Sequence, residues 1–416
     1  MSKKQFYFIL LIILSSNMAS SLFLQSIIIN RENTHSLNAS TTSIPSEYQI
    51  KNTVTYMVEI NFSLNQTSGS GNYNFKLPRL NHRGPNSTLS PLCPPYQESE
   101  LVYYDLYGNN PSQTLLNHTD RFNNTYDSFN ASLGPTNQEV KLSSKYIINL
   151  KEITFENILP SDIGIYNTSD NIFELYCNKS EAFYNRSDPN LIALSNNIVN
   201  PTDNPIIKAN KIINWISDNI EYNDSLEVEI GASRAYGNLT GDCSEFSSLM
   251  ITLLRIQGIP ARKITGFCIS NSHNFKPEKG EVYTFYSTKS ATNLLGHAWV
   301  EYYVPDIGWI ACDPTWHQVT NTYFNRIDYL RFNYNVGSWF FFPPDELHSE
   351  FPIPYATGSY IGTYNYEFQF KVTVLDTNYL SIDPMILIVI AIVVIIVVIS
   401  IIAIISVRKK RNKRNF

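Results

Sequence analysis

The sequence predicts an α+β protein with a β-rich first part, a mixed helical and sheet part after it, and one transmembrane helix near its end. Three observations support this prediction. Residues 47–158 alternate apolar and polar side chains as half-buried strands do, without helical periodicity. Helical spacing begins near residue 205 and returns after residue 243. Residues 385–407 are 23 consecutive uncharged residues dominated by Ile and Val, long enough to cross a bilayer.

The two ends of the chain predict export and membrane attachment. Residues 1–21 combine a basic start, a short apolar run and small residues, as a signal peptide does; an uncleaved N-terminal anchor is the alternative. Residues 22–46 form a polar spacer. The basic tail at residues 408–416 is expected in the cytoplasm by the positive-inside rule. We therefore expect a single-pass protein of the cell membrane, with residues 22–383 outside and contact with lipid through one helix.

The charge balance fits an exported domain on a basic anchor. The chain has 31 basic and 36 acidic residues, a net charge of −5, and several of the basic residues belong to the tail. No Gly-rich phosphate loop, internal repeat or basic aromatic groove appears, so no nucleic-acid partner is expected. The Asn-x-Ser/Thr sequons lie between Asn38 and Asn238, which predicts a glycoprotein.

Residues 47–158 predict a β-sandwich-like domain. A first strand is indicated by the alternating apolar residues Val54, Tyr56, Val58, Ile60 and Phe62. Residues 68–71 (Ser-Gly-Ser-Gly) predict a turn, and residues 73–77 begin the next predicted strand. Because this part contains no catalytic cluster, its expected role is binding or spacing.

The first catalytic candidate is Cys243, at the predicted start of a helix. The apolar residues behind it follow helical spacing as far as Gly258, and Pro260 prevents continuation. Asp242 can cap this helix, with Glu245 three residues on as in a capping box. A thiol in the first turn feels the positive end of the helix dipole, which predicts a lowered pKa for Cys243 and a better nucleophile.

Two further candidates, His297 and Asp313, lie on predicted neighbouring strands. Residues 297–304 and 309–313 have strand composition, with a turn between them. In such a hairpin His297 falls opposite or nearly opposite Asp313, about 5 Å away on the same face. The carboxylate then fixes the tautomer of the imidazole, and the imidazole can deprotonate Cys243.

Together these motifs resemble the transglutaminase-like superfamily, a branch of the papain-like cysteine enzymes. The resemblance covers roughly residues 187–325 and rests on the runs Gly241-Asp242-Cys243, Gly258-Ile259-Pro260-Ala261-Arg262, Gly296-His297-Ala298-Trp299-Val300-Glu301 and Gly308-Trp309 through Asp313-Pro314-Thr315. It implies a core of N-terminal helices packed on an antiparallel sheet. We therefore expect a catalytic domain at residues 160–325 and a β-rich extension at residues 326–383.

The resemblance also implies acyl transfer at a protein or peptide amide of the cell surface, through a thioester on Cys243. His297 would shuttle the proton, and Asp313 would orient His297. The backbone N–H of Cys243 would supply one oxyanion donor, and Tyr236 is the candidate for the other. Water would resolve the thioester in a peptidase or deamidase, whereas an amine would give cross-linking, and both outcomes stay open.

A second function, from another class, is a catalytically inactive domain that serves as a cell-surface binding module. No cofactor or metal is expected in either case, because no calcium-loop motif appears. His273 and His317 lack metal-ligand spacing and are expected at the surface.

The cysteines and the modular layout give two further expectations. Besides Cys243 there are four cysteines, which allow two disulfides in three pairings or are buried thiols: Cys93, Cys177, Cys268 and Cys312. The change of patterning near residue 158 predicts that residues 160–383 fold without the β-rich domain.

Overall fold

The computed structural model describes residues 48–85, 92–108, 111–120, 122–134, 138–181, 183–224, 226, 229–337 and 355–379, and four single residues between Ile396 and Ile401. The predicted signal peptide, spacer and tail lie outside the described residues, as does nearly all of the predicted transmembrane helix, and these remain predictions. Within the described part of the chain, no helix is long and apolar enough to cross a membrane.

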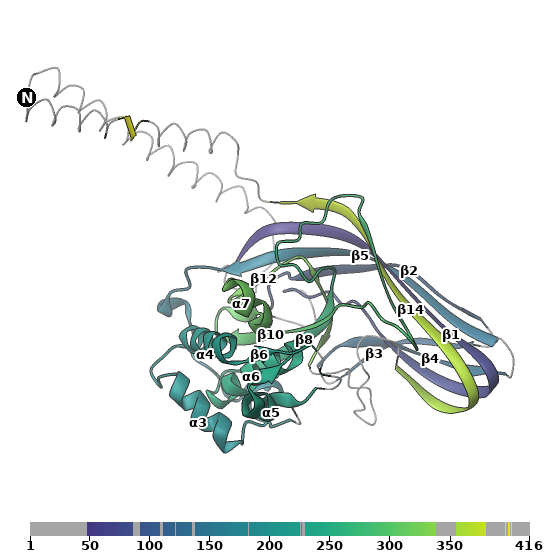
Figure 1. The fold of residues 1–416 in the computed structure, drawn as a ribbon, viewed down its shortest axis with the longest axis horizontal. Helices are drawn as coiled ribbons and strands as arrows, with labels where there is room; N and C mark the ends of the chain where they lie inside the picture. Colours follow the sequence, from purple (N-terminus) through teal and green to yellow (C-terminus); the bar gives the residue numbers. More distant parts are fainter. Residues whose placement is uncertain are drawn as a thin grey trace, which may run out of the picture. The chain divides into compact units, whose positions relative to one another are not determined.

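The larger sheet has eight strands and draws them from distant parts of the chain. Five of them lie in the order β12–β5–β1–β14–β9; β2 pairs with β5, and β4 pairs with β1 and β3. The strands are β1 (Tyr48–Pro78), β2 (Gln97–Gly108), β3 (Pro111–Thr119), β4 (Thr125–Leu133), β5 (Gln138–Phe155), β9 (Val282–Thr288), β12 (Arg326–Ile327) and β14 (Tyr355–Asn378). Because β9 and β14 come from the predicted catalytic domain and extension, the first part of the chain is not a separate sandwich (Figure 1).

Strand β1 confirms one expectation and corrects another. Its predicted apolar residues from Val54 to Phe62 are buried in alternation. The predicted turn at residues 68–71 is wrong, because the chain continues through it as one strand of 31 residues. Gly69 has φ 70° and pairs with Gly362 of β14, and a Cβ on Gly69 would lie 1.8 Å from the carbonyl oxygen of Ile361. The glycines therefore bend two paired strands together instead of reversing the chain.

The smaller sheet carries the catalytic candidates. Its four strands are antiparallel, in the order β11–β10–β8–β13, with bounds β8 (Ala261–Cys268), β10 (Gly296–Val304), β11 (Gly308–Cys312) and β13 (Arg331–Val336). Helices gather around β8 and β10 in Figure 1, as predicted for this core. They are α3 (Pro189–Ile198), α4 (Pro205–Asn219), α5 (Gly231–Asn238), α6 (Cys243–Ile256) and α7 (Pro314–Thr320). Short elements are η1 (Pro160–Asp162), α2 (Asn171–Tyr176), β6 (Glu221–Tyr222) and β7 (Thr240–Gly241).

Two hydrophobic clusters hold the sheets and helices together, and both cross the predicted boundary near residue 158. The first packs α6 and β10 against earlier side chains, among them Tyr96 and Phe155. The second packs the two sheets on each other, with the ring centroids of Phe267 (β8) and Phe370 (β14) 4.9 Å apart. Removing the first part of the chain would expose both clusters to water. The packing therefore argues against the expectation that the later part folds alone.

We predict that Phe370→Ala lowers the free energy of unfolding by about 3–5 kcal/mol, because it leaves a cavity between the sheets. Phe370 is fully buried, and it contacts both Phe267 and Phe332 of the small sheet. Denaturant unfolding should be followed by far-ultraviolet circular dichroism and by tryptophan fluorescence. All tryptophans lie between residues 215 and 339, so fluorescence reports on the later part of the chain. Both signals should shift together.

A matched control is Ile361→Ala on the same strand, where the side chain is 78% exposed. This change should alter the free energy of unfolding by less than about 0.5 kcal/mol. If Phe370→Ala shifts only the dichroism signal and leaves the fluorescence midpoint in place, the two parts unfold independently and the shared-core account is wrong.

Candidate active site

Cys243 is the first residue of α6, as predicted. Asp242 caps the helix, because its carboxylate accepts a hydrogen bond from the backbone N–H of Ser244 at 2.7 Å. The Glu245 side chain accepts from the backbone N–H of Asp242 at 3.1 Å, which confirms the predicted capping box. Gly241 allows this close turn, since a Cβ there would lie 2.3 Å from the Glu245 Cβ. The cap thus fixes the position of the candidate nucleophile.

His297 and Asp313 are brought together, with 2.6 Å between His297 Nε2 and Asp313 Oδ2. Asp313 follows β11 and caps α7, where its Oδ1 accepts from the backbone N–H of Trp316 at 3.0 Å. Continuing the register of β10 and β11 places Asp313 opposite Trp299, so it reaches His297 diagonally. The predicted pair is therefore on one face but offset by two residues.

Arg331 is a contact of this pair that the sequence analysis missed. Its Nη2 donates to the same Asp313 oxygen at 2.8 Å, and both side chains are fully buried. Burial alone would raise the pKa of Asp313, but the charges of His297 and Arg331 outweigh it and lower that pKa to about 2. The carboxylate therefore stays ionised. The one sign of this contact in the sequence was Arg331 itself, a basic residue at the start of an aromatic-rich stretch.

The thiol and the imidazole are neighbours without a direct hydrogen bond. The backbone N–H of Ala298, the residue after His297, donates to Cys243. Among the described side chains, no hydrogen bond joins the thiol of Cys243 to the ring of His297. Since Asp313 engages Nε2, Nδ1 is the ring nitrogen that can take the thiol proton.

The pKa of Cys243 is raised, which contradicts the lowered value predicted from the helix dipole. Burial is the largest cause and the Asp242 carboxylate adds to it, while the Ala298 amide and Lys263 act in the opposite direction. Burial, and then Glu245, raise the pKa of Asp242 itself to about 7. The cost of desolvating a thiolate thus outweighs the favourable effect of the helix dipole on the pKa of Cys243.

A buried ion pair anchors the first turn of α6 from the side of the sheet. Lys263 Nζ lies 2.6 Å from Glu229 Oε1 and donates to the carbonyl oxygen of Ser244 at 3.1 Å. The hydroxyl of Ser248 donates to the same Glu229 oxygen at 2.6 Å. The segment before Cys243, the helix and β8 are therefore tied at one point.

Tyr222 is a tyrosine whose phenol interacts electrostatically with Cys243. Strands β6 and β7 pair in parallel, which sets Tyr222 opposite Gly241. Burial is the largest cause of the raised pKa of the Tyr222 phenol, so the phenol stays protonated and can donate. Tyr236 instead packs on Trp215, with ring centroids 6.0 Å apart. The sequence suggested no role for Tyr222.

All five cysteines lie in the described part of the chain and are free thiols. Cys243 is partly exposed, and the other four are buried, which matches the buried-thiol alternative. Among the described residues, no group of three His, Cys, Asp or Glu side chains is arranged to hold a metal ion. His317 is buried rather than at the surface, and its Nε2 lies 3.1 Å from Asn214 Oδ1.

Comparison with known proteins matches part of the chain to a family. Residues 192–314 match the model of the transglutaminase-like superfamily. Over 75 residues the chain is 39% identical to the uncharacterized protein YebA of Bacillus subtilis. This aligned stretch covers 18% of this chain and 9% of YebA. Over 77 residues it is 32% identical to a protein-glutamine gamma-glutamyltransferase of Pseudomonas aeruginosa, covering 18% and 10%. The chain thus spans only 9% to 33% of the curated relatives that it matches.

The chain also resembles solved structures, and one of them aligns over 80% of it. It is a protein from Cytophaga hutchinsonii whose name marks it as a candidate cysteine protease. The TM-score is 0.48 at 15% sequence identity, and the alignment covers 80% of this chain and 94% of that chain.

We predict that iodoacetamide alkylates Cys243 slowly at pH 7. The rate should rise only when the pH exceeds the pKa of an ordinary thiol. Burial and the Asp242 carboxylate disfavour the thiolate, although partial exposure leaves Cys243 accessible. Asp242→Asn keeps a capping side chain and removes the charge, so the alkylation profile should move to lower pH. Peptide mass spectrometry measures the rate at each cysteine.

The buried Cys312 serves as the internal reference and should remain unmodified in the folded protein. Fast alkylation of Cys243 at mildly acidic pH, unchanged by Asp242→Asn, would show a resting thiolate–imidazolium pair, as the helix dipole alone predicts.

Proposed function

We propose that this chain, whose residues 192–314 form a transglutaminase-like domain, is a cysteine enzyme that transfers acyl groups from protein or peptide amides. One observation carries the proposal: the buried carboxylate of Asp313 contacts the ring of His297, and the next residue, Ala298, donates its backbone N–H to the partly exposed Cys243. Nucleophile, base and orienting carboxylate are the parts that amide acyl transfer requires.

In the proposed first step, Cys243 attacks the carbonyl carbon of an amide while its proton passes to Nδ1 of His297. Because the pKa of the thiol is raised, proton transfer accompanies the attack and does not precede it. Asp313 keeps the imidazole oriented and stabilises the imidazolium. His297 then donates the proton to the departing amine, which leaves a thioester on Cys243.

The developing oxyanion has two proposed donors. The backbone N–H of Cys243 lies at the start of α6, where helix N–H groups have no partner within the helix. The protonated phenol of Tyr222 is the second, because β6 pairs Tyr222 with Gly241, two residues before Cys243, and the phenol interacts electrostatically with Cys243. In this proposal Tyr222 takes the place of Tyr236, the second oxyanion donor that the sequence suggested.

The second half-reaction separates two products. Attack by water on the thioester gives hydrolysis, and attack by an amine gives a new amide bond. The relative named protein-glutamine gamma-glutamyltransferase favours a glutamine side chain as acyl donor and an amine as acceptor. We therefore propose transfer to an amine, rather than hydrolysis, as the second half-reaction.

An inactive binding module is the second candidate function. Two observations favour it: the raised pKa of Cys243, and the lack of a hydrogen bond between its thiol and His297 among the described side chains. The buried charge on Asp313 favours the enzyme, because an ionised carboxylate aimed at an imidazole is costly to keep in a module that does no chemistry.

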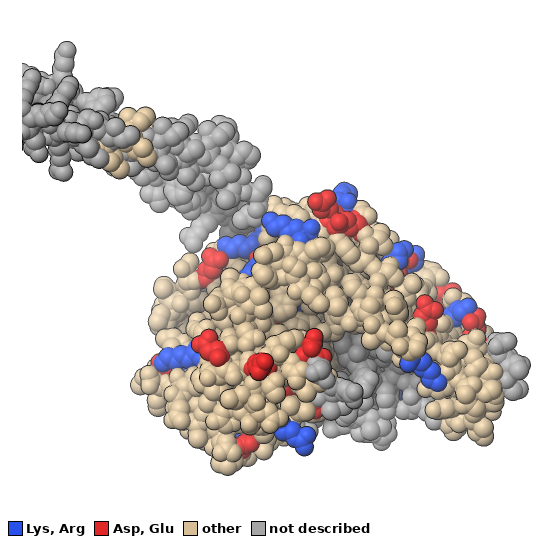
Figure 2. All heavy atoms as spheres, in the orientation of Figure 1, with Lys and Arg blue, Asp and Glu red and all other residues tan. Residues whose placement is uncertain are grey.

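We further propose that the domain acts outside the cell on a single-pass anchor, from the apolar run at residues 385–407 and the basic tail after it. On the face shown in Figure 2, acidic and basic side chains are interspersed. No cofactor is part of the proposed chemistry.

We predict that Cys243→Ala and His297→Ala abolish turnover of a glutamine-containing peptide, and that Asp313→Asn slows it by roughly 10³–10⁴-fold. Ammonia release measures the first half-reaction, and mass spectrometry with and without a primary amine separates transfer from hydrolysis. Cys177→Ala changes a buried thiol on α2's C-terminal side and should leave turnover intact. A folded chain that turns over no amide, with or without an amine, would support the binding module.

We also predict that Tyr222→Phe lowers kcat by roughly 10²–10³-fold with little change in KM, since an oxyanion donor acts mainly in the transition state. Tyr236→Phe is the matched control and should leave kcat within about twofold, a change too small for a lost oxyanion donor. Equal effects of the two substitutions would remove Tyr222 from the oxyanion site.

A further inference from the structure

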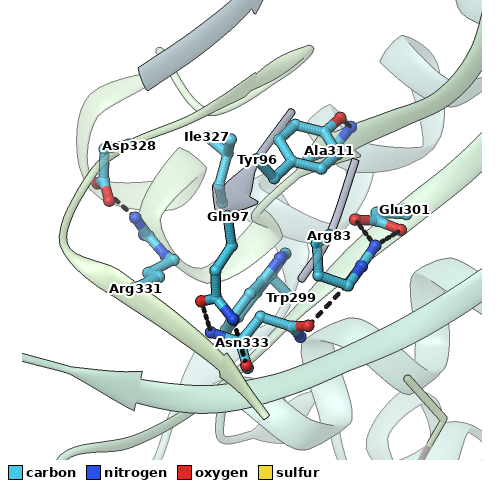
Figure 3. Close-up of a pocket in the computed structure, with 10 residues that line it drawn as sticks. All are labelled: Arg83, Tyr96, Gln97, Trp299, Glu301, Ala311, Ile327, Asp328, Arg331 and Asn333. Atoms are coloured by element: carbon cyan, nitrogen blue, oxygen red, sulfur yellow. Dashed lines mark hydrogen bonds and ion pairs between the residues drawn. The ribbon is translucent and has the colours of Figure 1, made fainter. Parts of the chain in front are cut away.

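Arg331 lies outside the segment that matches the transglutaminase-like model, yet it contacts the centre of the proposed triad. It begins β13, next to β8 in the small sheet. Its Nη2 donates at 2.8 Å to the Asp313 oxygen that also binds His297. Its Nη1 forms an ion pair with Asp328, as Figure 3 shows. One guanidinium therefore bridges two carboxylates.

The surroundings of Arg331 hold its guanidinium in one place. Asp328 is itself fixed, because it accepts hydrogen bonds from the hydroxyl of Tyr323 at 2.6 Å and from the backbone N–H of Leu330 at 2.9 Å. The guanidinium also lies over two aromatic rings, 4.0 Å from the centroid of Trp316 and 4.8 Å from that of Tyr323. The side chain is fully buried, so these contacts surround the guanidinium.

Trp316 connects this arrangement to the imidazole. Its ring centroid lies 5.9 Å from that of His297, and its backbone N–H donates to Asp313 Oδ1. The guanidinium over Trp316 thus supports both the carboxylate and the ring packed on the imidazole. The three contacts converge on one geometry for Asp313 and His297.

We infer that Arg331 is a positioning residue of the proposed triad, which fixes Asp313 and limits how strongly Asp313 holds a proton on His297. The inference rests on the proposed function. A carboxylate bonded to the imidazole alone would stabilise the imidazolium strongly and make it a poor base near neutrality. A second cation on the same oxygen offsets part of the negative charge, so the ring can accept the thiol proton during attack.

The other ionisable groups that feel Asp313 do not replace Arg331. They are Cys243, Cys268, Cys312, Tyr222 and His317. Burial raises the pKa of the thiols and the phenol and lowers the pKa of His317, so these groups are uncharged near neutrality. Among the described residues, Arg331 is the one permanently charged cation that forms an ion pair with Asp313.

The test is to measure the protonation midpoint of the His297 ring by NMR on full-length protein with labelled histidine. The signal of His297 is assigned by its loss in His297→Gln. Arg331→Gln removes the second cation, and the midpoint should rise by about one pH unit or more. Arg331→Lys keeps the charge and should restore most of the original midpoint. If the enzyme proposal is right, the acid limb of kcat/KM moves with it. The NMR reading needs no turnover, so the two proposals fail separately.

Arg83→Gln is the matched control. Arg83 lines the same pocket as Arg331 and is also buried (Figure 3). Its Nη2, however, pairs with Glu301, 2.7 Å away. This substitution should destabilise the fold to a similar degree and leave the His297 midpoint in place. A midpoint unchanged in folded Arg331→Gln, as in Arg83→Gln, would reduce Arg331 to a structural ion pair.

Asp328→Asn decides the matter if Arg331→Gln does not fold. Without the Asp328 charge, the guanidinium acts on Asp313 alone, so the His297 midpoint should fall instead of rise. The amide oxygen can still accept from Tyr323, although the amide nitrogen then cannot accept from the backbone N–H of Leu330. A midpoint that stays or rises in Asp328→Asn would overturn the inference.

Discussion

The carboxylate of Asp313 joins two strands of the small sheet and helix α7 at one buried point. It accepts hydrogen bonds from His297 on β10, from Arg331 on β13 and from the backbone N–H of Trp316 in α7. Burial of a charge is costly, and these three donors offset that cost only in this geometry. The positions of the imidazole, of the first turn of α7 and of β13 therefore depend on one another. The proposed chemistry depends on all three positions.

The large sheet contributes to the same site indirectly. Strand β9 pairs with β14, and the segment after β9 leads into His297 at the start of β10. The backbone N–H of Cys268 donates to the carbonyl oxygen of Leu295 at 2.8 Å, which holds that segment to the edge of the small sheet. A sheet whose strands come from residues 48 to 378 thus positions the chain that enters the active site, and this explains why the catalytic core and the β-rich part share their hydrophobic clusters.

Local signals in the sequence predicted the local structure. The cap at Asp242, the stop at Gly258 with φ 74°, and the hairpin that brings His297 to Asp313 all depend on residues close in the chain. The features that the sequence did not predict depend on distant partners. Pairing between β1 and β14 turned an apparent hairpin at Gly69 into a bend, and the role of Arg331 follows from a strand that no motif marked. The raised pKa of Cys243 was missed because desolvation depends on everything packed around the thiol, not on its place in the helix.

Cys243 is proposed to form a thioester with the help of His297 and Asp313, and this thioester can be detected on the protein. The protein is mixed with excess glutamine-containing peptide, quenched in acid within the first turnover, and examined by intact-mass and peptide mass spectrometry. The account predicts a peptide adduct on Cys243 that has lost ammonia, that hydroxylamine removes, and that His297→Ala does not form. A folded protein that forms no adduct on Cys243, or forms it equally in His297→Ala, would contradict the account.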